Sequence, residues 1–452
     1  MIQTISQVVE NHICTNCGTC VGVCPAGALE MVETLGGEML PQLNSERCTD
    51  CGLCHSVCPQ INIPARMKEH LVNPCVGPVR RAFLGEVLDP GIAAAGQTGG
   101  VGRTLLASAL EFGLCGAAVC VMDNPKKPLR PLAMIVRTPK EVFKSSRSKY
   151  CPIPVNALID EMVKSDVQIA FLGLGCHMQG LHLAMENLPK LRDRITLKIG
   201  LFCDRVMTYA AADHLIRCAG MAPQNVASFD YKHKACGGWP GDIRIVTSDG
   251  SVRNVSRYRR LDALEFFTPI HCRLCIDKLN VLSDVSLGDP WGVAKGKQVP
   301  TAAIVRTRVG EKVLLEAQKA AKINLAPVEA EAVIRGQNIA SRMDNCIKFR
   351  QEMTHRGYEL PTFLRTGPMG VERKGSRPLL VRWAVGFTIF SNTTKGTRAI
   401  TRIPPWLLAL WGAPKRWYRR WRFRFVHLMK SAMGLCSETL HVGKKADKFK
   451  SM

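Results

Sequence analysis

Eight of the twenty cysteines lie in one spacing motif that occurs twice near the start of the chain. The two copies read Cys14-x2-Cys17-x2-Cys20-x3-Cys24-Pro25 and Cys48-x2-Cys51-x2-Cys54-x3-Cys58-Pro59. Thiolates at this spacing bind [4Fe–4S] cubes, each cube taking three ligands from one copy and the fourth from the other. The pattern therefore assigns Cys14, Cys17, Cys20 and Cys58 to one cube and Cys48, Cys51, Cys54 and Cys24 to a second. Such cubes take up and release single electrons.

Disulfide bridges and zinc sites are the two alternative uses of these cysteines. A disulfide framework does not need one motif to be repeated, and zinc sites seldom use this run of short gaps. The spacing therefore favours iron–sulfur clusters, and residues 1–64 are interpreted as a dicluster ferredoxin domain. Short strands are expected at residues 29–32 and 39–42, with the cluster loops between them.

From about residue 80 the pattern changes to alternating helices and strands. The apolar residues of the segment 101–112 recur at helical spacing and end at Gly113, which predicts a helix. Short apolar runs at 117–122, 167–172 and 195–202 predict buried strands. Cys176 and Cys203 follow the last two of these strands, at the strand ends where open α/β sheets bind their ligands.

Four cysteines outside the doubled motif are candidates for a third site. They are Cys176, Cys203 and the C-x2-C pair Cys272 and Cys275. Four thiolates gathered in space could hold one more [4Fe–4S] cube. The alternative is that Cys176 and Cys203 are small buried apolar residues, as free cysteines often are. The spacing alone does not decide between the two.

Charge is unevenly distributed along the 452 residues, which carry a formal net charge of +24. Residues 371–452 hold eighteen Lys or Arg against three Asp or Glu, a net charge of +15. The many cysteines suit a reducing compartment, and the first thirteen residues lack the pattern of a signal peptide. The apolar stretch from Leu379 to Phe390 is too short to span a bilayer. A cytoplasmic protein is therefore expected, with a peripheral position on the inner face of the membrane as the variant that the basic tail suggests.

Several motifs between residues 80 and 340 resemble the coenzyme F-420 hydrogenase/dehydrogenase beta-subunit family, whose members often carry an N-terminal dicluster ferredoxin. The resemblance rests on Gly99-Gly100-Val101-Gly102-Arg103-Thr104, Ser148-Lys149-Tyr150, Phe171-Leu172-Gly173-x-Gly175-Cys176, Gly238-Trp239-Pro240-Gly241, His271-Cys272-x2-Cys275-x-Asp277 and Asp284-Val285-Ser286-Leu287-Gly288-Asp289. It implies FAD as a cofactor, a [4Fe–4S] cluster near the flavin and electron exchange with a partner. It also favours the third cluster, with Cys176, Cys203, Cys272 and Cys275 as ligands. Cys236 is a rival ligand.

Under this resemblance, FAD is expected to contact a glycine-rich helix start and a second segment that carries a cation and hydroxyls. The expected cofactor-binding residues are Thr98, Gly99, Gly100, Thr104, Ser148, Lys149 and Tyr150. Thr98 stands where the family often has Ser, and Gly175 stands where it commonly has Pro. An ordinary tight turn is the alternative for Gly99 and Gly100. No catalytic residue is assigned, and His271 is a candidate for tuning the neighbouring cluster.

The sequence thus predicts a multidomain protein of mixed α+β and α/β class. The expected segments are the ferredoxin domain at 1–64, the two parts of an α/β flavin-binding domain at 80–160 and 161–340, and a basic, partly helical and aromatic tail at 341–452. The expected function is an FAD-dependent iron–sulfur oxidoreductase that passes electrons between a two-electron donor or acceptor resembling coenzyme F-420 and one-electron carriers. A flavin suits this exchange because it takes electrons in pairs and releases them singly.

Two alternatives remain open. The chain is either an enzyme acting at its own flavin or an electron-transfer subunit whose substrate chemistry occurs on a partner protein. The resemblance implies a further alternative, a chlorophyllide-type tetrapyrrole reductase or a polysaccharide-pathway reductase. The arginine- and tryptophan-rich tail suits an anionic membrane surface or an acidic partner protein, and a merely solvated tail is the remaining alternative. Nucleic acid is not expected as a partner.

Overall fold

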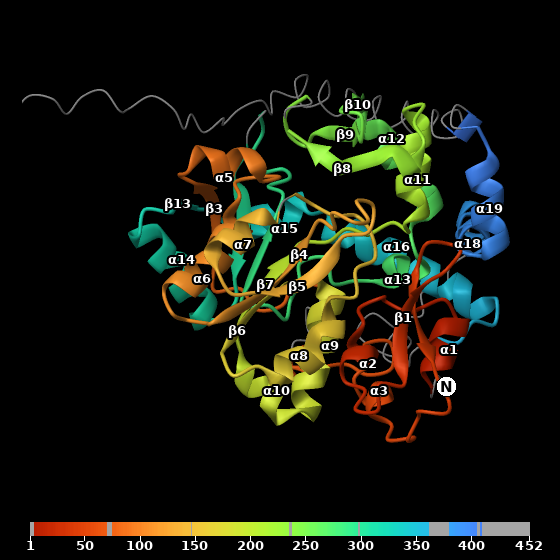
Figure 1. The fold of residues 1–452 in the computed structure, drawn as a ribbon, viewed down its shortest axis with the longest axis horizontal. Helices are drawn as coiled ribbons and strands as arrows, with labels where there is room; N and C mark the ends of the chain where they lie inside the picture. Colours follow the sequence, from red (N-terminus) through yellow and green to blue (C-terminus); the bar gives the residue numbers. More distant parts are fainter. Residues whose placement is uncertain are drawn as a thin grey trace, which may run out of the picture. The chain divides into compact units, whose positions relative to one another are not determined.

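The computed structural model describes residues 4–69, 75–145, 147–234, 237–296, 299–360, 379–404 and 407–408 (Figure 1). Residues 1–402 form one compact unit and residues 403–452 a second. Of the second unit only four residues are described, so most of the predicted basic tail lies outside the described residues. The rival ligand Cys236 also lies outside them.

The cysteine motif is folded around a small two-stranded sheet. Strand β1 (Leu29–Glu33) pairs antiparallel with β2 (Met39–Leu43), as predicted, with Leu29 opposite Leu43. Gly18 and Gly52 each follow a motif cysteine at a positive φ, +80° and +72°, a conformation that glycine adopts at little cost. Each begins a single helical turn, so the repeat in sequence is also a repeat in structure. The helices of this region are α1 (Ile5–Glu10), α2 (Thr19–Gly22), α3 (Leu53–Ser56) and α4 (Ala65–Lys68).

An eight-stranded mixed sheet forms the centre of the first unit, in the order β13-β3-β12-β11-β7-β6-β4-β5. The pairs β4–β6, β6–β7 and β7–β11 are parallel, and the other neighbours are antiparallel. The strands are β3 (Arg81–Val87), β4 (Ala117–Met122), β5 (Leu132–Val136), β6 (Ile169–Gly173), β7 (Ile195–Leu201), β11 (Val285–Gly288), β12 (Thr301–Val305) and β13 (Ile323–Pro327). The three predicted strands correspond to β4, β6 and β7, which confirms the α/β prediction. Their carboxyl ends meet at one edge of the sheet.

Successive residues of β4 serve opposite faces of this sheet, because strand side chains alternate. Ala118 and Cys120 belong to the core under α6 (Val101–Glu111) and α14 (Arg308–Lys319). Ala117 and Val119 belong to the core on the other face. The predicted helix is thus present as α6. Helices α5 (Pro90–Ala95) and α7 (Pro139–Lys144) lie near α6 (Figure 1).

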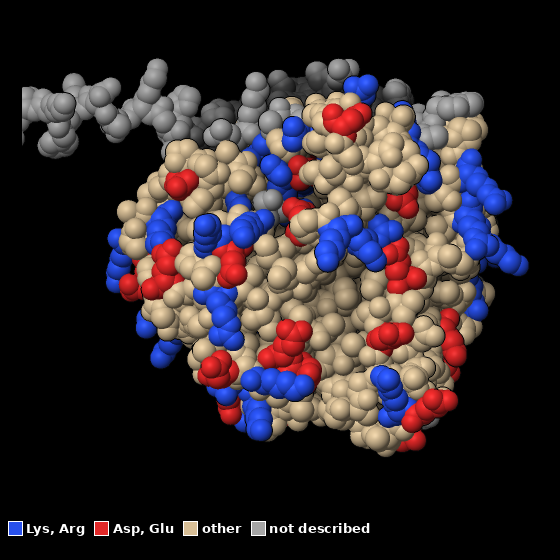
Figure 2. Space-filling model, viewed as in Figure 1, with Lys and Arg blue, Asp and Glu red and all other residues tan. Residues whose placement is uncertain are grey.

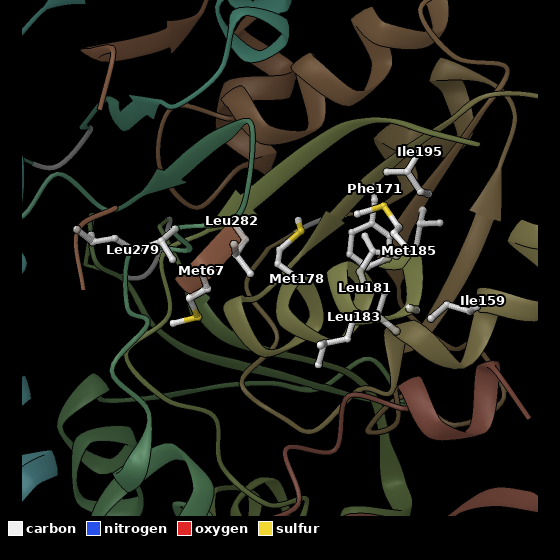
Figure 3. Close-up of a cluster of buried hydrophobic side chains, with 14 of the residues drawn as sticks. Met67, Ile159, Phe171, Met178, Leu181, Leu183, Met185, Ile195, Leu279 and Leu282 are labelled. Atoms are coloured by element: carbon white, nitrogen blue, oxygen red, sulfur yellow. The ribbon is translucent and has the colours of Figure 1, made fainter. Parts of the chain in front are cut away.

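The second core joins the sheet to the cysteine-motif region. Phe171 of β6 and Met178 and Leu181 of α9 (Gly175–Asn187) pack there without exposure, beside α8 (Ile159–Lys164) (Figure 3). The same core takes in Met67 of α4, which Figure 3 shows near Leu282. The cysteine-motif region therefore packs as part of one compact unit. The short helices η1 (Val155–Leu158), α10 (Pro189–Arg194) and α15 (Ala330–Gly336) complete this part of the fold.

A smaller antiparallel sheet, which the sequence did not predict, and several helices complete the unit, and the helical segments after residue 341 lie in the tail that was predicted to be partly helical. The sheet has the order β10-β9-β8, formed by β8 (Val226–His233), β9 (Asp242–Thr247) and β10 (Val252–Val255). The helices are α11 (Ala210–Cys218), η2 (Pro223–Asn225), α12 (Arg257–Phe267), α13 (Ile270–Leu274), α16 (Ile339–His355), α18 (Leu379–Ser391) and α19 (Thr394–Arg402). In the part of the chain described here, no helix combines the length and the apolar character needed to cross a bilayer.

Candidate functional site

The structure groups the eight motif cysteines in the crossed arrangement that the spacing predicts. Cys20 and Cys58 each lie close to Cys14 and Cys17, and Cys54 lies close to Cys51, Cys48 and Cys24. Burial raises the pKa of the Cys20 and Cys58 thiols well above the ordinary value, and the neighbouring cysteines raise it further. Buried thiols crowded in this way suit a cationic metal centre, which stabilises thiolates.

The two groups differ in exposure. The first group, called here the inner quartet, consists of Cys14, Cys17, Cys20 and Cys58, and all but Cys14 are buried. The second group, called here the outer quartet, consists of Cys24, Cys48, Cys51 and Cys54. Cys51 is exposed and the other three are partly exposed. Cys20 also lies close enough to Cys54 for their charges to interact, so the quartets are neighbours. The two groups therefore lead from the interior of the unit to its surface.

Within the described residues, no three His, Cys, Asp or Glu side chains are grouped so that they could hold a single metal ion. The sulfur ligands of one zinc ion all lie about 2.3 Å from the metal. A cube binds each thiolate at a different iron, so its ligands stand farther apart. This observation therefore bears on zinc sites and not on cubes.

The four scattered cysteines come together around a cavity of about 290 Å³, called here the cysteine cavity. Cys176 lies in the first turn of α9, Cys203 follows β7, Cys272 lies on α13 and Cys275 ends that helix. All four line the cavity. Cys17 of the inner quartet is the cysteine that acts most strongly on Cys176, so the cysteine cavity adjoins the inner quartet. The structure thus brings together the four cysteines that were predicted as a third ligand set, and their role as ligands stays a prediction.

Charged residues that the sequence analysis did not single out surround this cavity. Asp204, next to Cys203, forms ion pairs with Arg205 and Arg342 at 3.1 Å and lies 3.7 Å from the ammonium of Lys278. Burial alone would raise the pKa of Asp204, but these three cations lower it to about 2. Asp204 is therefore ionised at neutral pH. Arg205, Arg342 and Arg350 line the cavity, and the arginines of α16 carried no motif that could have indicated them.

A larger cavity, of about 610 Å³, lies at the carboxyl edge of the parallel strands and is called here the basic cavity. Cofactor sites commonly have volumes of roughly 300–1,000 Å³. Of the predicted cofactor residues, Thr98, Gly100, Ser148, Lys149 and Tyr150 line it. The two segments that the resemblance pointed to are therefore brought together around one space.

The other two predicted cofactor residues, Gly99 and Thr104, do not line this cavity. The carbonyl of Gly99 accepts a hydrogen bond from the backbone N–H of Val87 at 3.0 Å, and a Cβ at Gly99 would lie 2.4 Å from the carbonyl oxygen of Gly85. Gly99 therefore serves the close approach of this loop to β3. Thr104 is buried on α6, and its hydroxyl donates to the carbonyl of Gly100 at 3.2 Å. Both residues therefore stabilise the start of α6 without lining the cavity.

The basic cavity is lined by many cations and few anions. Its cations are Arg103, Arg147, Lys149, Arg205, Lys232, Arg257, Arg260 and Lys278, and its carboxylates are Asp204 and Asp289. Lys232 pairs with Asp289 at 3.0 Å, whereas burial lowers the pKa of Arg260 and of Arg103. The N-terminus of α6, which carries a partial positive charge, opens on the same space. The arrangement fits an anionic group such as a pyrophosphate.

The two cavities share one wall. Its eight residues line both spaces: Cys151, Ile153, Leu174, His177, Cys203, Asp204, Arg205 and Val206. Cys203, one of the four cysteines gathered around the smaller cavity, is therefore also in contact with the larger one. Cys151, a buried thiol that belongs to none of the cysteine motifs, lies in the same wall.

Four of the described histidines are buried and neutral. Burial lowers the pKa of His177, His182, His214 and His271 to about 4. His271 is the residue singled out from the sequence, and its Nε2 lies 3.3 Å from the Sγ of Cys272. It also lies close to Glu38 and the backbone of Cys14, so it stands between the cysteine cavity and the inner quartet.

The fold and the cysteines define a protein that joins an N-terminal iron–sulfur dicluster domain to an α/β sheet. Comparison with family models specifies it further. A 4Fe–4S dicluster domain matches residues 13–61, and the N-terminal and C-terminal domains of coenzyme F420 hydrogenase/dehydrogenase beta subunits match residues 82–160 and 166–331. The last two models together cover more than half of the chain. The chain therefore belongs to the coenzyme F420 hydrogenase/dehydrogenase beta-subunit family, an oxidoreductase family, as its motifs predicted.

Individual relatives agree with this assignment. The coenzyme F420-dependent sulfite reductase of Methanocaldococcus jannaschii is 24% identical over 344 residues, which cover 72% of this chain and 49% of the relative. The chain thus spans about half the length of that protein. One of the subunits of the F(420)H(2) dehydrogenase of Methanosarcina mazei is 24% identical over 315 residues, which cover 68% of this chain and 83% of that relative.

A solved structure shares the fold. A chain in the F420-reducing [NiFe] hydrogenase complex from Methanosarcina barkeri superposes with a TM-score of 0.52 at 20% sequence identity. The similarity covers 62% of this chain and 95% of that chain.

Proposed function

We propose that the chain passes electrons between a two-electron donor or acceptor at an FAD in the basic cavity and one-electron carriers at the outer quartet. The observation that carries this proposal is the order of the sites. The basic cavity shares a wall with the cysteine cavity, Cys176 of the cysteine cavity lies close to Cys17 of the inner quartet, and Cys20 lies close to Cys54 of the outer quartet.

The residues of the basic cavity have separate roles under this proposal. Thr98, Gly100 and the N-terminus of α6 would receive the phosphates, with Lys149 and Arg147 supplying positive charge. Tyr150 and Ser148 would add hydroxyls to the same wall. FAD, when bound, supplies the exchange between paired and single electrons. These residues would hold FAD in the basic cavity, which shares a wall with the cysteine cavity.

The three groups of cysteines would each hold one [4Fe–4S] cube. Cys176, Cys203, Cys272 and Cys275 are the proposed ligands of the third. Cys272 is buried and the other three are partly buried, so a cube there would have less contact with solvent than one at the outer quartet. The exposed Cys51 makes the outer quartet the place where a soluble one-electron carrier or a partner subunit would make contact.

The experiment uses full-length protein purified without oxygen. Three cubes predict about twelve irons and twelve acid-labile sulfides per chain, together with extractable FAD. The holoprotein is then mixed with reduced coenzyme F420, NAD(P)H or reduced ferredoxin, and the flavin absorbance is followed. Bleaching by a hydride donor alone supports an enzyme acting at its own flavin. Bleaching only by reduced ferredoxin supports an electron-transfer subunit, which the names of the relatives also suggest.

Two results would overturn the proposal. Protein with about twelve irons but no affinity for FAD would remove the flavin from the basic cavity. A Cys176→Ser variant that keeps FAD and still passes electrons to the outer quartet at the rate of the unmodified chain would remove the third cube from the path.

We further propose that the basic C-terminal region docks on an anionic membrane surface. Residues 379–404 contain no Asp or Glu. Leu379, Trp383 and Phe390 of α18 are 77%, 49% and 46% exposed, and α19 exposes basic side chains. Figure 2 shows blue and no red side chains over α19, at the right edge of this view. Each basic residue near such a surface adds about 1 kcal/mol of binding free energy.

Vesicle flotation tests this docking. The full chain is compared with a variant carrying Lys395→Glu, Arg398→Glu and Arg402→Glu, on phosphatidylcholine vesicles with and without phosphatidylserine. We expect binding that requires phosphatidylserine and is lost in the variant, whereas Arg192→Glu on α10 leaves it unchanged. Equal partitioning of all three proteins would end the membrane proposal and leave an acidic partner protein as the ligand of this region.

A further inference from the structure

One face of α16 is turned toward the cysteine cavity. Arg342, Cys346 and Arg350 follow one another at intervals of four residues, so they lie along the same side of the helix. The Sγ of Cys346 and the Nη2 of Arg350 both contact the carbonyl oxygen of Leu274, at 2.8 and 2.7 Å. Leu274 lies between Cys272 and Cys275, so α16 holds the loop that carries two of the proposed ligands. Helix α16 begins after residue 331, where the matched family models end.

Arg342 reaches the cavity from this face. Its Nη1 donates to the backbone oxygen of Asp204 and to the Oδ1 of Asp204, the latter at 3.1 Å. Its side chain is 12% exposed. An arginine guanidinium stays protonated throughout the physiological pH range, so Arg342 is a permanent positive charge beside the cysteines that line the cavity.

The hydrogen-bonding capacity of the two arginines is not used up by the protein. Among the described residues, the Nε of Arg342 and the Nε and Nη1 of Arg350 are buried and have no hydrogen-bond partner. Arg350 is only 5% exposed, and both residues line the cavity. Buried guanidinium N–H groups without partners are costly, so a negatively charged group in the cavity would stabilise them.

We infer that Arg342 sets the reduction potential of the cluster held in the cysteine cavity, by stabilising the extra negative charge of the reduced cluster. This rests on the proposed function, because it assumes a cube at Cys176, Cys203, Cys272 and Cys275. A cube with four thiolate ligands is negatively charged and gains one more negative charge on reduction. The reaction is the uptake of one electron from an external reductant such as dithionite, without a bond formed or broken.

Asp204 has the opposite effect. It lies beside Cys203, and its carboxylate pairs with Arg205 and Arg342, so its negative charge disfavours an added electron. Arg342 and Asp204 are paired, so if the pair had only a structural role, loss of either partner would change the reduction potential in the same direction. If the charges tune the potential, loss of the two partners shifts it in opposite directions. The sign of the potential shift therefore distinguishes a structural role from an electrostatic one.

The test is an EPR-monitored redox titration of full-length holoprotein purified without oxygen. The signal of the third cluster is identified as the one missing from Cys176→Ser. Arg342→Gln removes the charge at similar size, Arg342→Lys keeps the charge, and Asp204→Asn removes the opposing charge. Arg192→Gln on α10 is the control, because its side chain is 62% exposed and it lines neither cavity. Iron is counted in each protein.

We expect Arg342→Gln to lower the equilibrium constant for one-electron reduction of the third cluster at least about tenfold, a shift of about 59 mV to more negative potential. Asp204→Asn should shift the same signal to more positive potential. Arg342→Lys should stay near the unmodified chain, and Arg192→Gln should not shift any signal. The signals of the inner and outer cubes should move less than the signal of the third.

Several outcomes would overturn the inference. With about twelve irons present, unchanged potentials in Arg342→Gln, or shifts of the same sign in Arg342→Gln and Asp204→Asn, would leave Arg342 with a structural role only. If Arg342→Gln does not assemble the cluster, the sign of the shift in Asp204→Asn still decides. About eight irons in the unmodified chain would instead refute the third cluster of the proposed function, and the tuning role would fall with it.

Discussion

The cysteine-motif region and the α/β region both bring groups of four cysteine thiols together, but they do so in two different ways. In the first, each group takes three cysteines from one loop, and a glycine at positive φ turns the chain between them. In the second, Cys176, Cys203, Cys272 and Cys275 come from three separate places along about a hundred residues. The first arrangement is local and tolerates changes elsewhere. The second exists only if the eight-stranded sheet, α13 and α16 are all in place.

The difference predicts different kinds of sensitivity. A substitution in the local motif should remove one cluster and leave the fold intact. A substitution that disturbs the sheet edge should damage the cavities and the stability of the protein together.

The largest effect is expected from Cys58→Ser, because Cys58 comes from the other copy of the motif and completes the inner quartet. Loss of the inner cube would interrupt the only route that the proposal offers between the cysteine cavity and the outer quartet. We expect about eight irons in place of twelve, and a fall of at least about a hundredfold in the rate at which electrons reach the outer cube. Iron analysis and stopped-flow absorbance measure the two effects.

Cys218→Ser is the matched control for this substitution. Cys218 lies on α11, partly exposed, and its Sγ is 3.5 Å from the Nε2 of His214. It lines neither cavity. It should keep about twelve irons and the unmodified rate. Equal iron contents in Cys58→Ser and Cys218→Ser would contradict the crossed assignment of the inner quartet.

The second largest effect is expected at the sheet edge, from Gly99→Ala. The added Cβ would lie 2.4 Å from the carbonyl oxygen of Gly85 and 3.1 Å from the backbone nitrogen of Thr301, so β3 or β12 must move. Overpacking of this kind costs about 1–3 kcal/mol of unfolding free energy. We expect a lower Tm in differential scanning calorimetry and a lower FAD content in the same preparation.

Gly102→Ala provides the comparison, three residues further on. Its Cβ would meet Leu287 at 3.5 Å, an ordinary contact, and alanine favours the helix α6 more than glycine does. Its Tm should be equal to or above that of the unmodified chain. A Gly99→Ala protein as stable as Gly102→Ala would show that the loop does not depend on the close approach to β3.

A third, smaller effect is expected when the charge of the basic cavity changes. The Lys149 side chain is 8% exposed and pairs with Asp123 at the end of β4. A charge-assisted hydrogen bond is worth about 1.5–3 kcal/mol, so Lys149→Met should weaken FAD binding roughly tenfold to a hundredfold. Asp123→Asn should leave FAD binding unchanged or strengthen it. Titration of flavin-depleted protein with FAD measures both, and weaker binding in Asp123→Asn than in Lys149→Met would contradict the proposed role of the cation.

The same contrast explains how far the sequence could predict this molecule. The doubled motif predicted the strands β1 and β2 and the proximity of Cys58 to Cys14 and Cys17, because short spacings dictate loop geometry. The assignment of each group of cysteines to a cube stays a prediction. Apolar runs predicted β4, β6 and β7 and the helix α6. The sequence pattern placed Cys176 and Cys203 at strand ends. The prediction that they lie close to Cys272 and Cys275 rested on the family resemblance.

Other features could not be predicted because they depend on contacts between distant segments. The small sheet β8–β10 and the face of α16 with Arg342 and Arg350 carry no local signal of a site. The cations Lys232, Arg257 and Arg260 reach the basic cavity only because the small sheet and α12 lie beside it. Charged residues are ordinarily found on solvated surfaces, so composition alone gave no reason to select these three.

The smallest predicted effect concerns Thr98 and Thr104. The sequence predicted both residues to bind the cofactor, but only Thr98 lines the basic cavity. The hydroxyl of Thr98 lies 2.8 Å from the hydroxyl of Thr301. Thr104 does not line the cavity, and its hydroxyl donates a hydrogen bond to the carbonyl of Gly100. Thr98→Val should therefore weaken FAD binding a few-fold, through the loss of one neutral hydrogen-bonding group worth about 1 kcal/mol.

Thr104→Val should instead leave the affinity for FAD within about twofold and lower the unfolding free energy by about 1 kcal/mol. FAD titration and chemical denaturation of the two variants separate these outcomes. If Thr104→Val weakens FAD binding more than Thr98→Val does, the cofactor would have to contact the helix behind the loop. The basic cavity would then be the wrong place for the flavin, even if the three groups of cysteines are correctly assigned.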